Sequence, residues 1–191
     1  MTPTINIGPL QLRHRGKVEE IVRATGVFNE GEVSVALEVF DEGMRHGARD
    51  VGNDATLQTM DPTPDPYELI GAFSGDDLVG YACYGATPST DRTYDLYWIA
   101  VHPHAQKAGA GAALMSEVEQ RLETRRARVV VVETSSRDDY APTRRFYHRL
   151  GYIEAARLRD FYAPGDDRVV LSKRLGSGDP GGKVAARPLS S

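Results

Sequence analysis

The chain has 191 residues, the size of one domain or of one domain with tails. Its 40% hydrophobic and 26% charged residues are typical of a soluble globular protein. A net charge of −4 argues against a general nucleic-acid binder, and the single cysteine, Cys83, excludes an intrachain disulfide. No apolar run approaches a membrane span of roughly 18 residues. The first ten residues lack the order of a signal peptide, so we expect a cytoplasmic protein without membrane contact.

The first part of the chain predicts one strand and two helices. Ile5–Arg13 alternates weakly, as an edge strand does, and Lys17–Thr25 places three apolar residues on one helical face. Asn29 is the expected N-cap of the second helix, because Glu32 three residues later completes a capping box. Gly47–Pro66 contains three prolines in five residues, which excludes a helix or a central strand there.

The remaining segments predict strands alternating with helices. The expected strands are Tyr67–Phe73, Leu78–Tyr84, Thr93–Val101, Arg128–Glu133, Tyr152–Phe161 and Arg168–Leu175, and the expected helices are Gly109–Arg126 and Tyr140–Leu150. Four consecutive valines in Arg128–Glu133 are typical of a strand buried on both faces. This order indicates an α/β (α+β) fold in which helices cover a mixed sheet. We expect one domain over residues 1–175 and a disordered tail over Gly176–Ser191, which is rich in glycine, proline and serine.

A glycine-containing loop is the most informative local feature. The segment Trp98–Met115 leads from a strand into a helix that opens with Gly109 and Gly111. A helix N-terminus exposes unpaired N–H groups, and glycine allows close approach, so with Lys107 nearby the expected guest is a phosphate or pyrophosphate. The loop is not a P-loop, because no Lys-Ser/Thr pair follows Gly111. It is not a dinucleotide-binding fingerprint either, because Leu114 occupies the position of that motif's last glycine or alanine. Taken alone, it equally suits a helix start chosen for close packing.

Two blocks together resemble the GNAT superfamily of acetyl-CoA-dependent N-acetyltransferases. The first is Gln106-x-x-Gly109-x-Gly111, which follows the strand end Val101-x-Pro103 and is similar to the acetyl-CoA loop of that family. The second lies within residues 140–152 and has an aromatic-Tyr pair followed by x-x-Leu-Gly-aromatic. The resemblance covers about Ile5 to Leu175. It implies a mixed, mostly antiparallel, twisted sheet of about seven strands flanked by about four helices.

The resemblance also implies which residues bind acetyl-CoA, with no metal involved. Ile99 and Val101 are expected to pair with the pantetheine arm through main-chain groups. The family motif often has asparagine where Tyr140 stands, so either Tyr140 or the serines Ser135 and Ser136 are expected to touch the cofactor. The pyrophosphate is expected to be ringed by Gln106, Lys107, Ala108, Gly109, Ala110, Gly111 and Ala112.

Acyl transfer from a thioester to an amine passes through a tetrahedral oxyanion, which needs hydrogen-bond donors. By resemblance, the N–H group of Val101 is the expected oxyanion donor, and Tyr147 is the expected acid for the leaving thiolate. The base that deprotonates the amine is left open between Asp95, Glu133 and a chain of waters. Strand alternation places Asp95 on the same face as Tyr97, Ile99 and Val101. Glu133 ends the valine strand, where desolvation would raise its pKa.

The acceptor site is the part of the protein that the sequence defines least. The family places it between the first helices and the sheet, where the candidates are Phe28, Asn29, Glu30, Glu32, Arg45, Tyr81, Tyr84, Tyr94, Tyr97 and Trp98. An acidic and aromatic pocket suits a cationic amine, although core packing also explains each ring. We expect an N-acetyltransferase for a primary amine of a small molecule or peptide, or alternatively a non-catalytic acyl-CoA-binding sensor or accessory domain. A longer acyl donor and a homodimer are compatible with the sequence, whereas nucleic acid is not needed to explain it.

Overall fold

A computed structural model describes residues 4–47 and 67–176. The predicted loose segment Gly47–Pro66 and the predicted tail Gly176–Ser191 lie outside the described residues, apart from their first glycines. The strands are β1 (Ile5–Pro9), β2 (Glu68–Ser74), β3 (Asp77–Ala86), β4 (Thr93–Val101), β5 (Val129–Ser135), β6 (Ile153–Ala163) and β7 (Asp166–Arg174). The helices are α1 (Arg15–Ala24), α2 (Glu30–Gly47), α3 (Pro103–Gln106), α4 (Ala110–Thr124) and α5 (Ala141–Arg149), with short 3-10 helices at Leu12–His14 and Asp138–Tyr140.

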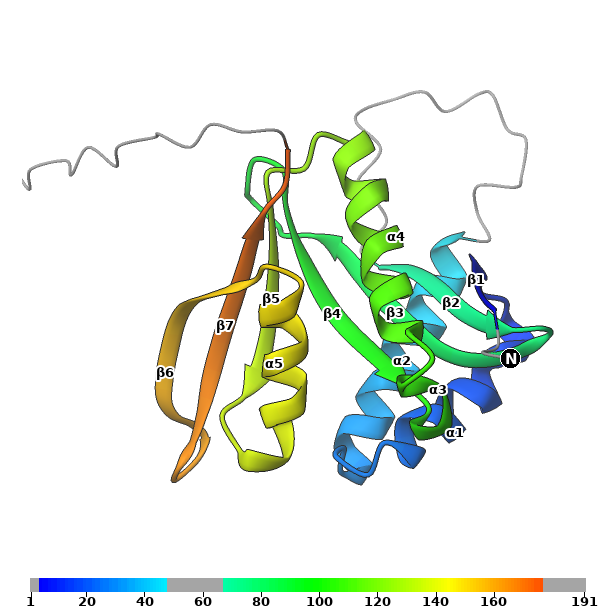
Figure 1. The fold of residues 1–191 in the computed structure, drawn as a ribbon, viewed down its shortest axis with the longest axis horizontal. Coiled ribbons are helices and arrows are strands. Elements are labelled where there is room, and N and C mark those ends of the chain that lie inside the picture. Colours follow the sequence, from blue (N-terminus) through cyan, green and yellow to red (C-terminus); the bar gives the residue numbers. More distant parts are fainter. Residues whose placement is uncertain (1–3, 48–66, 177–191) are drawn as a thin grey trace, which may run out of the picture.

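The strands form one seven-stranded sheet in the order β1-β2-β3-β4-β5-β7-β6. Among the described pairs, β4 and β5 are parallel and the others are antiparallel, which confirms the predicted mixed, mostly antiparallel sheet. In Figure 1, α4 and α5 cover one face of the sheet and α1 and α2 lie behind it. The predicted stripe of α4, which is Leu114, Val118 and Leu122, is fully buried in the first of these layers. The other face buries the α1 residues Val18 and Ile21.

The fourth and fifth strands separate along their length. They pair from Thr93 opposite Val129 to Leu96 opposite Val132, and beyond these residues each strand continues without the other. Figure 1 shows the two strands diverging into a V, with α5 beside one arm and α3 near the end of the other. A β-bulge at Tyr97 lies where the separation begins, since the register with β3 shifts there. The bulge bends β4 away from β5 and so opens the sheet.

The burial of β5 differs from the prediction. Val130 and Val132 are buried against the α4 and α5 layer, whereas Val129 and Val131 are partly exposed and Glu133 is exposed. The prediction of a strand buried on both faces is therefore wrong. Helices pack on one face of β5, and beyond Val132 its other face borders the opening between the strands rather than a helix.

The capping box at the start of α2 is confirmed. Asn29 Oδ1 accepts the Glu32 N–H at 3.0 Å, and Glu32 Oε2 accepts the Asn29 N–H at 2.8 Å. Together these bonds satisfy two donors that a helix start leaves unpaired. They also hold the loop between α1 and α2, which carries Phe28, at the edge of the opening.

We expect Asn29→Ala to lower the free energy of unfolding by about 0.5–2 kcal/mol, because the cap loses its acceptor. Urea unfolding followed by circular dichroism measures this change. Ser34→Ala, on the exposed side of the same helix, serves as the control and should change stability by less than about 0.5 kcal/mol. Equal losses for the two variants would contradict the role of the cap.

Candidate active site

A cleft of about 1130 Å³ fills the gap between the separated ends of β4 and β5. Leu96 and Val132 lie at its closed end, where the strands last pair. Residues from both faces of the sheet line it, including Gly111 of α4 on one face and Phe28 before α2 on the other. The cleft therefore runs through the sheet and connects the two helical layers.

The main-chain groups of Ile99 and Val101 face this cleft. The His102 N–H donates to the Val79 carbonyl at 2.8 Å, which makes these residues a hydrogen-bonded pair of the ladder with β3. In an antiparallel ladder such pairs alternate with non-hydrogen-bonded pairs, so Val101, opposite Gly80, turns its N–H and C=O away from β3. The same alternation applies to Ile99. Since β5 has separated at this height, Ile99 offers its N–H and C=O groups and Val101 offers its N–H group to an extended ligand, while the Val101 carbonyl accepts from the Gln106 side chain.

The loop before α4 has the geometry of an anion site. Gly109 is the N-cap and has a φ of 84°, in the left-handed region that favours glycine. The Ala113 N–H bonds to the Gly109 carbonyl at 2.9 Å, so the N–H groups of the three residues between them have no acceptor inside the helix. Such N–H groups, together with the helix dipole, are able to bind a phosphate. Gln106 steadies the loop by donating to the Val101 carbonyl at 3.2 Å.

The absence of a side chain at Gly111 keeps the passage between α4 and α5 open. A Cβ there would lie 3.4 Å from the Phe146 ring and 3.7 Å from Val101 Cγ2. Of the seven residues predicted to ring a pyrophosphate, five line the cleft: Gln106, Lys107, Gly109, Gly111 and Ala112. Ala108 is outside the lining and Ala110 is fully buried, so these two can contribute only backbone.

Tyr147 lines the cleft from α5, on the same face of the sheet as the loop. Its side chain is buried, with its ring 5.3 Å from that of Phe146 and 5.6 Å from that of Tyr152. Burial raises the pKa of Tyr147 above its usual value, so the phenol stays protonated at neutral pH. A protonated phenol in a fixed position is able to donate to a leaving sulfur.

Asp95 is not brought to the cleft. The bulge at Tyr97 reverses the alternation of side chains along β4. Ile99 and Val101 therefore point to the same face as Leu96, whereas the Asp95 side chain points to the opposite face. The prediction that Asp95 shares a face with Ile99 and Val101 is therefore wrong. The Asp95 carboxylate instead accepts the Thr87 hydroxyl at 2.7 Å and does not line the cleft.

Glu133 does line the cleft, immediately after the last residue of β5 that pairs with β4. It lies on the face opposite Val132, toward the α1–α2 side of the opening. Its side chain is 41% exposed and forms an ion pair with Arg168 of β7. The predicted desolvation of Glu133 is therefore wrong, because the strand end borders an open cleft instead of a packed layer.

The start of α5 contributes Tyr140, which lines the cleft beneath the guanidinium of Arg137 at 5.2 Å from the ring centroid. Burial raises the pKa of Tyr140 to about 12. Of the two alternative serines, Ser135 also lines the cleft, and both form hydrogen bonds to the start of β7. The Ser135 hydroxyl donates to the Asp166 carboxylate, and Ser136 Oγ accepts the Asp167 N–H at 2.7 Å.

The predicted acceptor residues divide between two cavities and the core. Phe28, Asn29, Glu32, Tyr97 and Trp98 line the cleft, and the rings of Phe28 and Trp98 lie 5.1 Å apart. Arg45 instead lines a separate cavity of about 650 Å³ between α2 and β2. Glu30 pairs with Arg23, Tyr81 and Tyr84 are core residues, and Tyr94 packs against the core.

Sequence reasoning missed the contribution of the β6–β7 hairpin. Tyr162 and Asp166 both line the cleft, although the sequence predicted only a strand and a turn there. The register of the hairpin breaks between Leu158 and Ala163, and Asp160 has a φ of 51°. The irregular part of the hairpin thus lies at the cleft, and no local sequence motif predicts this position.

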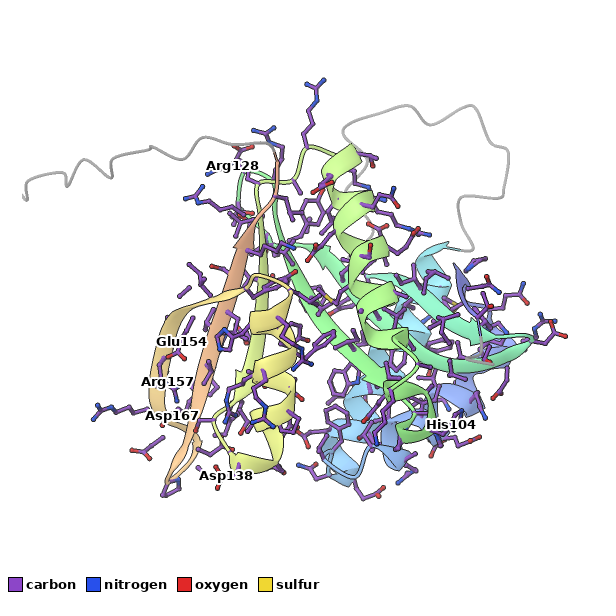
Figure 2. All side chains as sticks on the ribbon, viewed as in Figure 1. His104, Arg128, Asp138, Glu154, Arg157 and Asp167 are labelled. Atoms are coloured by element: carbon purple, nitrogen blue, oxygen red, sulfur yellow. The ribbon has the colours of Figure 1, made fainter. Side chains whose placement is uncertain are left out.

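Of the charged residues outside the predicted site, Arg137, Asp139 and Arg149 also line the cleft, and several others lie away from it. Figure 2 places His104 on α3 and Asp138 before α5, on opposite sides of the opening, and Arg157 between Glu154 and Asp167 along the hairpin. His102 and His104 have no third ligand, since no His, Cys, Asp or Glu side chains of residues 4–47 and 67–176 gather in a group of three or more. In that same part of the chain, no helix is long and apolar enough to cross a membrane.

Comparison with known proteins identifies the family of this chain. The model of the Acetyltransferase (GNAT) family matches residues 37–152. A crystal structure of a protein assigned to the GNAT acetyltransferases, from Desulfovibrio desulfuricans, is 38% identical with a TM-score of 0.78 and covers 91% of this chain and 100% of its own. No match is found among the curated proteins.

Two more distant structures share the fold. The ribosomal-protein-S18-alanine N-acetyltransferase of Escherichia coli is 17% identical with a TM-score of 0.65, over 93% of this chain and 97% of its own. The PaiA N-acetyltransferase of Thermoplasma acidophilum, in complex with coenzyme A, is 14% identical with a TM-score of 0.65, over 90% and 99%. Because the family model spans more than half of the chain and the 38% identical structure nearly all of it, this protein belongs to the GNAT family of N-acetyltransferases.

Proposed function

We propose that the protein transfers an acetyl group from acetyl-CoA to a primary amine of a small molecule or peptide. The observation that carries this proposal is the cleft that runs through the sheet. On one face it ends at an anion-binding helix start, and on the other face it opens beside α2 and the β6–β7 hairpin. A donor and an acceptor can thus enter from opposite faces and meet between β4 and β5.

The residues present fit acetyl-CoA along its length. The pyrophosphate lies at the unpaired N–H groups of α4, between Lys107 and the space left by Gly111. The pantetheine arm lies along the backbone of Ile99 and Val101 that faces away from β3. The cleft continues beyond these residues to its closed end at Leu96 and Val132.

The chemistry is a direct attack of the neutral amine on the thioester carbonyl. The C–N bond forms while the carbonyl oxygen becomes an oxyanion, which accepts from the main-chain N–H group of Val101. The C–S bond then breaks, and Tyr147 donates its hydroxyl proton to the departing sulfur. Glu133, on the acceptor face, takes the proton that the amine loses. The products are the N-acetyl amine and the free thiol of coenzyme A.

Calorimetric titration of acetyl-CoA, followed by a thiol-release assay with a panel of amines, tests this proposal. We expect binding of acetyl-CoA together with thiol release that depends on the amine. Binding without release by any amine would instead support a non-catalytic acyl-CoA sensor. The absence of binding would show that the glycine loop serves only to pack α4.

Matched substitutions test which of the two candidate carboxylates, Glu133 or Asp95, acts as the base. We expect Glu133→Gln to make the rate follow the neutral fraction of the amine, so that turnover falls about tenfold per pH unit below the amine pKa. At pH 7 the loss is about tenfold for an amine with a pKa near 8, and it disappears above that pKa. Asp95→Asn, the same change outside the cleft, should leave the profile unshifted. A profile that changes with Asp95→Asn and not with Glu133→Gln would reverse the assignment.

A further inference from the structure

Two apolar side chains form the closed end of the cleft. Leu96 of β4 lies opposite Val132 of β5, and beyond this pair the strands separate into the V of Figure 1. Both side chains are buried in the hydrophobic cluster on the α4 and α5 side of the sheet, and both also line the cleft. On this face of the sheet the cleft therefore ends at an apolar wall, which consists of Leu96 and Val132.

A second pair of residues lies behind the apolar wall. Tyr94 and Val130 are opposite each other, two residues before the first pair in each strand. Strand alternation puts both pairs on the same face of the sheet, where Tyr94 and Val130 pack in or against the same hydrophobic cluster. Val130 is fully buried, and neither residue of the second pair lines the cleft. Space opened at the apolar wall would therefore lengthen the cleft only as far as this second pair.

The start of α4 lies at the other end of this half of the cleft. A Cβ at Gly111 would lie 3.7 Å from Val101 Cγ2, so the anion-binding helix start is beside the last residue of β4. From Val101 the strand leads back through Ile99 to Leu96, and all three side chains point to the same face. An extended donor with its phosphates at the start of α4 thus directs its acyl end toward the apolar wall.

The chemistry of the apolar wall suits an alkyl chain. Burying such a chain against Leu96 and Val132 removes apolar surface from water without desolvating a charged group. The Glu133 carboxylate follows next along β5, but its side chain points to the opposite face of the sheet. We propose that Leu96 and Val132 close an acyl site and thereby set the longest acyl group that the protein accepts from its donor. This inference rests on the proposed function and specifies the donor.

A series of donors that differ only in acyl length tests the acyl site. Thiol release is measured with acetyl-, propionyl-, butyryl-, hexanoyl- and octanoyl-CoA and one amine that supports turnover. A single added methylene in a hydrophobic pocket changes kcat/KM by about 10–200-fold, and a chain that reaches the apolar wall has no room for another. We therefore expect kcat/KM of the native protein to fall about tenfold or more at one step of the series.

Shortening either side chain of the apolar wall should move this step. Val132→Ala and Leu96→Ala each make room for further chain carbons, so we expect the fall in kcat/KM at a later member of the series. Val130→Ala is the matched control, because it is the same change on the same face of β5, behind the apolar wall. It creates a similar loss of core packing, but the fall should stay at the native step.

A lengthened side chain tests the same site in the opposite direction and keeps the core filled. Val132→Ile adds one methylene where the acyl chain would end. We expect it to lower kcat/KM about tenfold or more for the longest acyl group that the native protein accepts. Thermal unfolding of all the variants checks that each is folded at the assay temperature.

A binding measurement separates this inference from the proposed function. Calorimetric titration of the same acyl-CoA series without an amine requires no turnover, and we expect affinity to fall at the same step as kcat/KM. Discrimination by acyl length in binding, without thiol release by any amine, would overturn the transfer reaction and support the acyl site. Three results would overturn the acyl site: equal binding and equal kcat/KM along the series, a native step in both Val132→Ala and Leu96→Ala, or an equal shift in Val130→Ala.

Discussion

Tyr147→Phe is expected to lower turnover by a factor on the order of 10²–10⁴ and to leave the dissociation constant of acetyl-CoA nearly unchanged. The substitution removes one hydroxyl and keeps the ring, which packs between Phe146 and Tyr152. A thiol with a pKa near 8.5 leaves moderately well without help, so some activity should remain. Burial raises the pKa of Tyr147, so its proton is present throughout the neutral range, and the native enzyme should show no loss of rate between pH 7 and pH 9 from this group.

Tyr152→Phe is the matched control for this prediction. Tyr152 is also a buried phenol and contacts the Tyr147 ring, but it does not line the cleft. Loss of its hydroxyl should therefore change turnover only slightly. Thiol release under saturating acetyl-CoA measures both variants. If the two lose activity equally, the effect of Tyr147→Phe comes from packing; if Tyr147→Phe turns over normally, the acid lies elsewhere.

Gly111→Leu is expected to weaken acetyl-CoA binding by at least about 100-fold, which corresponds to about 2.7 kcal/mol. The Cβ alone would lie 3.4 Å from the Phe146 ring, and the rest of a leucine side chain would fill the passage at the start of α4. The unpaired N–H groups would remain, but a pyrophosphate would have no room to reach them. Calorimetric titration with acetyl-CoA measures the loss directly.

Ser116→Leu shows whether an added leucine on this helix has an effect of its own. Ser116 is exposed on α4 and does not line the cleft, so this variant should bind acetyl-CoA as the native protein does. Thermal unfolding of Gly111→Leu checks the fold, and leucine in place of glycine favours a helix by roughly 0.8–1 kcal/mol. A folded Gly111→Leu variant with native affinity would place the pyrophosphate away from this loop.

Local chemistry in the sequence accounts for much of the fold and for one half of the site. Hydrophobic periodicity identified the buried stripe of α4, and the spacing of Asn29 and Glu32 identified the cap of α2. Gly109 and Gly111 pointed to the helix start that lines the cleft. Each of these features depends on residues close together in the chain, so spacing and side-chain type are sufficient to predict it.

Positions that depend on strand register were not predictable in the same way. Simple alternation placed Asp95 with Ile99 and Val101, but one extra residue at Tyr97 turns it to the opposite face. The valines of β5 suggested a strand buried on both faces, but the separation of the strands leaves Glu133 at an open cleft. A bulge of one residue changes the face of every residue beyond it, and no composition signal marks where it occurs.

The sequence by itself determined the family, the order of the elements and the glycine loop at the start of α4, because these are carried by short motifs and by periodicity. The tertiary structure decided how far β4 and β5 separate, which faces their side chains occupy, and that Glu32 and Asp166 line the same cleft. The physical reason is the range of the interactions. Caps and helix stripes are formed by neighbours in the chain, whereas the cleft is assembled by sheet register and hairpin geometry from segments more than a hundred residues apart.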